Sequence, residues 1–93
     1  MVIEIDFNSD EAIYMQITNQ IIMGIATSRL HEGDTLPSVR QLAMELSINP
    51  NTIQRAYMQL EQEGLIYPVK GKGNFIADSE EVRKISKAPI QKN

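Results

Sequence analysis

The stretch INPNTIQRAYMQLEQEGLI, residues 48–66, carries the start and stop signals of one helix. Asn49 is a favourable N-cap residue, and Pro50 follows at the first helical position, where its missing N–H costs nothing. Gly64 is the kind of residue that commonly follows a helix end, because glycine adopts positive φ without strain. An apolar stripe marks the side that we expect to face a core, at Ile53, Ala56, Tyr57 and Leu60.

The opposite side of this expected helix has no acidic residue before Glu61. A carboxylate there would be repelled by DNA phosphates. The amides of Asn51 and Gln54 can instead each form two hydrogen bonds to adenine, and the guanidinium of Arg55 can do so to guanine. The outward positions, spaced at i, i+3, i+4 and i+7, are Asn51, Gln54, Arg55 and Met58.

The first residues of the same helix predict contacts with the DNA backbone. Asn49 and Thr52 suit phosphate oxygens, helped by the free N–H groups of a helix start. Arg55 also has a structural alternative, an ion pair with Glu61 or with an acid of the preceding helix. The sequence leaves these two roles of Arg55 open.

An amphipathic helix is expected near the start of the chain. Residues 12–29 carry isoleucine at every fourth position, which predicts one buried face. Ser9 or Asp10 is the expected N-cap, with Glu11 in the first turn, where the helix dipole favours an acid. Before it, residues 2–7, VIEIDF, alternate apolar and acidic and predict a short strand or an extended arm.

A second, shorter helix is expected between these two. Ser38 is a good N-cap, and residues 39–46 place apolar side chains at i, i+3, i+4 and i+7. Residues 30–37, LHEGDTLP, read as a loop, and residues 47–49 break the helical pattern. The chain therefore predicts two helices joined by a turn of about three residues.

Two short strands are expected after residue 64. LIYPV and NFIAD, residues 65–69 and 74–78, are rich in strand-forming residues, and Pro68 confines the first to an edge position or to its end. Glycines in the connecting KGKG allow a tight turn and a close approach to phosphate, while its lysines displace counterions. The candidate contacts in this turn are Lys70, Gly71 and Lys72.

The order helix, helix, turn, helix, strand, wing, strand is that of a winged helix-turn-helix, a mainly α fold with a small β-hairpin and a three-helix core. In this arrangement the third helix lies in the major groove. Arg40, on the polar face of the second helix, is expected to clamp the DNA backbone or reach a guanine. Four bases are expected to share one surface: Arg40, Arg55, Lys70 and Lys72.

Composition excludes most catalytic and metal chemistry. The 93 residues include no cysteine and one histidine, so neither a Cys-based zinc site nor a multi-His metal site is expected. We find no paired acid and base, no Ser–His arrangement and no phosphate-binding loop, and we therefore expect no enzyme and no cofactor. No apolar run reaches 18 residues, which predicts a cytoplasmic protein without membrane contact.

The formal net charge of −3 argues against nucleic acid, but its distribution does not. Residues 1–35 hold six acids and one base, residues 36–78 hold four of each, and residues 79–93 hold two acids and four bases. The acidity therefore lies in the N-terminal third, and the expected helix-turn-helix and wing are neutral overall. The field at a contact face matters more for DNA than the total charge.

Residues 11–78 resemble the DNA-binding domain of GntR-family bacterial transcription regulators. The motifs IYMQI, GDTLPSVRQLA, NTIQRAYMQLEQEGLI and GKGNFIA occur in the family's order, and INPNTIQRAYMQLE is similar to the YtrA-like subgroup. Family members often have Arg where Pro50 and Gln54 stand, which implies a different base preference here. The resemblance implies DNA contacts at Arg40, Asn49, Asn51, Thr52, Gln54, Lys70 and Gly71.

The resemblance also implies a transcriptional regulator, a repressor, that binds a palindromic operator in double-stranded DNA as a homodimer. Residues 1–10 would form an arm, and residues 79–93 the start of a truncated dimerisation or effector region; a longer form would bind an unknown small molecule. Either the chain is a fragment, which we favour, or its dimer contacts are reduced. The alternative function is a winged-helix module that binds protein and shows no salt-dependent binding to duplex DNA.

Overall fold

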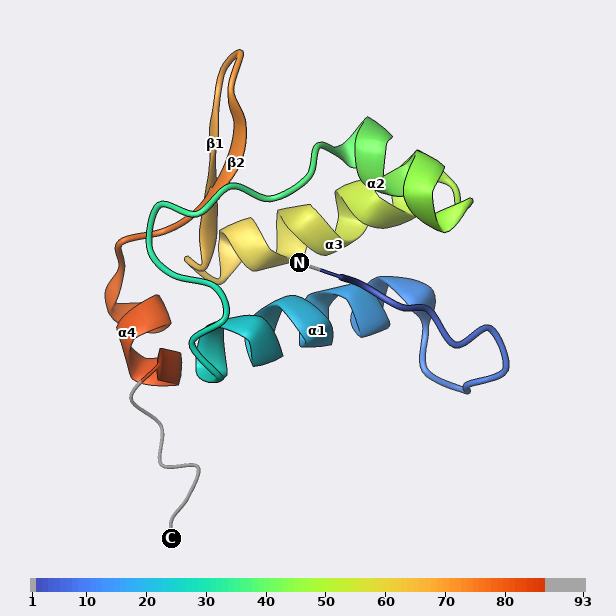
Figure 1. The fold of residues 1–93 in the computed structure, drawn as a ribbon, viewed down its shortest axis with the longest axis horizontal. Coiled ribbons are helices and arrows are strands. Elements are labelled where there is room, and N and C mark those ends of the chain that lie inside the picture. Colours follow the sequence, from blue (N-terminus) through green and yellow to red (C-terminus); the bar gives the residue numbers. More distant parts are fainter. Residues whose placement is uncertain (1, 87–93) are drawn as a thin grey trace, which may run out of the picture.

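Four helices and one β-hairpin make up residues 2–86, the part of the chain that the computed structural model describes (Figure 1). The prediction of a mainly α winged helix-turn-helix with a small hairpin is confirmed, and a fourth helix follows the hairpin. Of the predicted dimerisation or effector region, residues 79–93, the last seven residues lie outside the described part of the chain. In chain order the elements are α1 (Ile13–Ala26), α2 (Val39–Leu46), α3 (Pro50–Gln62), β1 (Ile66–Val69), β2 (Gly73–Ile76) and α4 (Glu80–Ser86).

The core lies where α3 packs between α1 and α2, and the hairpin projects from the C-terminal end of α3 (Figure 1). Ile17, Ile21 and Ile25 of α1 and Ile53 and Leu60 of α3 have 0% of their surface exposed. Spacings of four residues in α1 and of seven in α3 put each set on one face of its helix. Burying each such side chain contributes about 1.5–3 kcal/mol, so the apolar stripes determine how the helices pack.

The start of α1 corrects the sequence-based prediction. Neither Ser9 nor Asp10 caps the helix, and Glu11 lies before its first turn. The buried side chain of Gln16 holds the approaching loop instead: its Nε2 donates to the carbonyls of Asp6 (3.0 Å) and Glu11 (2.9 Å). A side chain inside the helix therefore fixes the entry of the chain, and local spacing does not reveal it.

The N-terminal segment is an extended arm rather than a strand. Ile3 is buried against the core, with 7% of its surface exposed. The N–H of Glu4 donates to Oε1 of Gln20 (3.0 Å), and Nε2 of Gln20 donates to the carbonyl of Glu4 (2.6 Å). The glutamine amide thus takes the place of a strand partner and keeps the arm on α1.

α1 ends at Ala26, three residues before the predicted end at residue 29. Ser28 adopts a positive φ of 62°, and the N–H of Leu30 donates to the carbonyl of Gly24 (2.9 Å). A Cβ at Gly24 would lie 2.9 Å from Cδ1 of Leu30. The glycine therefore allows Leu30 to fold back onto the end of the helix and close the core there.

The segment predicted as a loop between α1 and α2 pairs with the hairpin on the open side of β2. Thr35 forms an antiparallel bridge with Phe75, and the N–H of Leu36 donates to the carbonyl of Asn74 (2.9 Å). β1 pairs with β2 on the other side, with Pro68 opposite Asn74. Pro68 thus lies on an edge strand, as predicted, because the free edge of β1 needs no N–H there.

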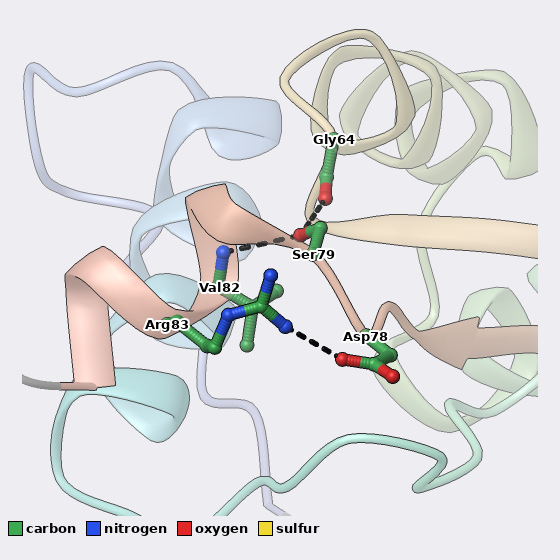
Figure 2. Close-up of polar contacts among 5 residues, drawn as sticks. All are labelled: Gly64, Asp78, Ser79, Val82 and Arg83. Atoms are coloured by element: carbon green, nitrogen blue, oxygen red, sulfur yellow. Dashed lines mark hydrogen bonds and ion pairs between the residues drawn. The ribbon is translucent and has the colours of Figure 1, made fainter.

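α4 is attached to the end of α3 by a small polar cluster (Figure 2). Oγ of Ser79 accepts from the N–H of Val82 (3.1 Å) and donates to the carbonyl of Gly64 (2.7 Å). Nη1 of Arg83 donates to Oδ1 of Asp78 (2.7 Å). Val82 itself is 2% exposed, so the first turn of α4 belongs to the core.

Candidate nucleic-acid interface

α2 and α3 each begin at a side-chain cap that the sequence predicted. Oγ of Ser38 accepts from the N–H of Gln41 (3.0 Å) at the start of α2. Oδ1 of Asn49 accepts from the N–H of Asn51 (2.8 Å), and Pro50 is the first residue of α3. Both predicted N-caps are confirmed, and they fix where the two helices begin relative to each other.

Tyr57 braces α3 against the segment that leads into α2. Its hydroxyl donates to the carbonyl of Pro37 at 2.6 Å, and 3% of the residue is exposed. Burial and, secondarily, the charge of Glu45 raise the pKa of Tyr57 above its ordinary value of 10.0. The hydroxyl therefore stays protonated as a donor at neutral pH.

The outward face of α3 is exposed and carries no acid over its first three turns. A shallow groove of about 330 Å³ follows this face. Amides, one arginine and one methionine line it, so it can form hydrogen bonds without repelling phosphate. The lining residues are Asn51, Gln54, Arg55, Met58, Gln59 and Gln62.

Arg55 has a partner that the sequence did not indicate. Its guanidinium carbon lies 3.8 Å from the centre of the Tyr14 ring, on α1. Such a contact contributes about 0.5–1 kcal/mol at an exposed site. Within residues 2–86, Arg55 forms no ion pair with Glu61 or with an acid of α2, so that structural alternative is wrong.

The remaining bases of the expected DNA surface are exposed. Within residues 2–86, Arg83 pairs with Asp78, and Nδ1 of His31 lies 3.6 Å from Oδ2 of Asp34; neither contact involves Arg40, Lys70 or Lys72. In the part of the chain that is described, these three cations are not neutralised by an acid in direct contact. They are therefore available to a polyanion.

The tip of the hairpin is a tight turn. The N–H of Lys72 donates to the carbonyl of Val69 (2.9 Å), and Gly71 adopts a φ of 80°, which favours glycine. Behind the tip, the rings of Tyr67 and Phe75 stack across the strands with centres 5.8 Å apart. The stack stiffens the base of a wing whose two lysines project at its end.

The sequence missed two residues that support this surface. The apolar stripe of residues 48–66 predicts only that Tyr57 faces the core. The structure adds that Tyr14 also contacts Arg55 and that Tyr57 bonds to Pro37. Both contacts join residues far apart in the chain, so spacing gave no signal for them.

Among residues 2–86 there is also no group of three His, Asp or Glu side chains able to hold a metal ion, and no helix long and apolar enough to cross a bilayer.

A helix-turn-helix with a lysine-tipped hairpin defines the class: a winged helix-turn-helix protein whose exposed helix face suits nucleic acid. Residues 13–76 match the family described as "Bacterial regulatory proteins, gntR family". The chain belongs to this GntR family of DNA-binding transcription regulators. The resemblance read from its motifs is therefore confirmed, as is the prediction that it is not an enzyme, because the family consists of regulators.

Several known proteins share this domain. The HTH-type transcriptional repressor YtrA of Bacillus subtilis (strain 168) is 42% identical over 77 residues, which are 83% of this chain and 59% of the repressor. The structure of YtrA from Sulfolobus acidocaldarius, a GntR-family transcription factor, has a TM-score of 0.77 and 40% identity, and the match covers 85% of this chain and 83% of that one. The structure of AraR(DBD) in complex with operator ORX1 has a TM-score of 0.69 and 25% identity, covering 81% and 96%. This chain spans less than two thirds of the length of the curated relatives that it matches.

Proposed function

We propose that this regulator is a sequence-specific repressor that places α3 in the major groove and the KGKG wing on the phosphate backbone. The observation that carries the proposal is the acid-free, amide-lined face of α3. The exposed cations Arg40, Lys70 and Lys72, which have no acidic partner among residues 2–86, support it. Asn51 and Gln54 would contact base edges, and Arg40 the backbone or a guanine. Backbone contacts would come from Asn49, Thr52, Arg55, Lys70, Gly71 and Lys72.

The relatives support binding to an operator and repression. The Bacillus subtilis YtrA is named a repressor, and AraR(DBD) was solved in complex with an operator. By analogy, this chain would bind a palindromic operator in double-stranded DNA as a homodimer in the cytoplasm. Residues 11–78 would form the DNA-binding unit, with residues 1–10 as an arm and residues 79–93 as the start of a dimerisation region. In a longer form this region would bind a small-molecule effector.

The test is binding to duplexes selected from a random pool, measured over a series of salt concentrations. Gln54→Ala is expected to lose about 1–3 kcal/mol on the selected site and to relax base preference at one position. Lys72→Ala is expected to weaken binding to every duplex equally. It should also lower by about one the salt slope, which is the magnitude of the slope of the logarithm of the binding constant against the logarithm of the salt concentration. The difference between the two variants separates base reading from backbone contact.

Lys84→Ala is the matched control for Lys72→Ala. It removes the same charge from an exposed position on α4, which lies away from the wing tip (Figure 1). It should leave the salt slope unchanged. A salt slope near zero for the unmodified chain would contradict the proposal and favour a winged-helix module that binds protein instead.

A further inference from the structure

Two amide side chains at the start of α3 have no partner within residues 2–86. Each of two neighbouring amides uses one of its ends: Oδ1 of Asn49 caps α3, and Nε2 of Gln59 donates to Oε2 of Glu63 (3.1 Å). The side chains of Asn51 and Gln54 are exposed, and neither forms a hydrogen bond to a described residue. Each therefore offers a free donor and a free acceptor on the proposed contact face.

The one basic side chain of α3, Arg55, contacts a residue of α1. Its guanidinium lies on the ring of Tyr14, 3.8 Å from the ring centre, and Tyr14 is a half-buried residue of α1. In this structure the contact places the guanidinium against α1, although Arg55 also lines the groove of the α3 face.

We propose that α3 reads bases through Asn51 and Gln54 without Arg55, and that each half-site therefore contains A·T pairs at the positions α3 contacts. An amide presents a donor and an acceptor side by side, which matches N7 and N6 of adenine. Guanine presents two acceptors in the major groove, which match an arginine and leave the amide oxygen without a partner. This inference rests on the proposed DNA-binding function.

The experiment begins with site selection from a random duplex pool by the full 93-residue chain. Selected half-sites are expected to share A·T pairs that lose their preference in Asn51→Ala or Gln54→Ala. Replacing the contacted adenines with 7-deazaadenine removes the N7 acceptor. This should weaken binding of the unmodified chain about tenfold. The Gln54→Ala variant should bind equally well with or without the replacement at the adenine that Gln54 contacts.

Variants of Arg55 and Tyr14 form the second part of the experiment. Arg55→Ala is expected to leave the selected sequence unchanged while it weakens binding to all duplexes equally. Tyr14→Leu removes the ring and should admit guanine at a position next to the A·T pairs, whereas Tyr14→Phe keeps the ring and the original preference. Thermal unfolding of both Tyr14 variants checks that they fold.

The outcomes separate this inference from the proposed function. Salt-dependent binding to selected sites that lack A·T pairs would overturn the inference and leave DNA binding intact. A guanine preference that disappears in Arg55→Ala would also overturn it, as would an unchanged preference in Tyr14→Leu. Absence of any salt-dependent binding to duplexes would contradict the proposed function itself.

Discussion

At the scale of single residues, the hydroxyl of Tyr57 is expected to stabilise the fold. It donates to the carbonyl of Pro37 at 2.6 Å in a buried setting, so Tyr57→Phe leaves that carbonyl without this donor. We expect the free energy of unfolding in urea to fall by about 1 kcal/mol. Tyr67→Phe, at a residue that is 43% exposed, is the control and should change little. Equal effects of the two variants would contradict a special role for the Tyr57 hydroxyl.

The same residue predicts sensitivity to alkali. Burial, helped by the charge of Glu45, raises the pKa of Tyr57 in the folded state above the ordinary 10.0 expected for the unfolded chain. The folded state thus holds this proton more tightly, and its stabilising effect is complete below pH 10 and declines as the pH rises above it. Urea unfolding between pH 8 and about 11 should show a fall in stability that is smaller in Tyr57→Phe.

Residue-level prediction succeeded where the cause was local. Asn49, Pro50 and Gly64 act within one turn of a helix end, so their types and order are sufficient to assign their roles. It failed at α1, where the amide of Gln16 replaces the expected cap by reaching back to the loop. It also missed the contact between Tyr14 and Arg55, because only the packing of α1 against α3 brings them together.

At the scale of elements, α4 depends on Ser79. Its Oγ caps the helix through the N–H of Val82 and also donates to the carbonyl of Gly64 at the end of α3 (Figure 2). Ser79→Ala removes both bonds, and we expect about 1–2 kcal/mol of destabilisation in thermal unfolding. Ser86→Ala changes an exposed serine at the other end of α4 and serves as the control. A loss no larger than that of the control would show that α4 is not held by this cap.

The elements show how far periodicity reaches. Helical stripes predicted α2 and α3 well, because each buries one face against a neighbour. The bridge of Thr35 to Phe75 was not predicted, because a single rung has no alternating pattern and its flanking Gly33 and Pro37 indicate a loop. What completes the hairpin is therefore a contact set by the path of the chain around α1, not by strand propensity.

At the scale of the whole molecule, charge is separated along the fold rather than balanced everywhere. Four of the six acids of the first 35 residues precede α1, and the other two, Glu32 and Asp34, follow it. Arg40 and the wing lysines have no acidic partner among residues 2–86. The sequence predicted this separation from its charge distribution alone. It could not predict which basic groups would be held by the protein itself, since that requires the positions of the helices.

This separation predicts that the acidic third reduces DNA affinity through long-range repulsion. Asp10 is exposed, and its side chain forms no hydrogen bond or ion pair with another described residue. Asp10→Asn should therefore tighten binding to every duplex at low salt, by a similar factor for selected and unselected sequences. The gain should shrink as the Debye length falls from about 30 Å at 0.01 M salt to about 8 Å at 0.15 M. Titrations at these two salt concentrations measure the effect, and a gain that is confined to one sequence, or that persists at 0.15 M, would mean that Asp10 acts by direct contact instead.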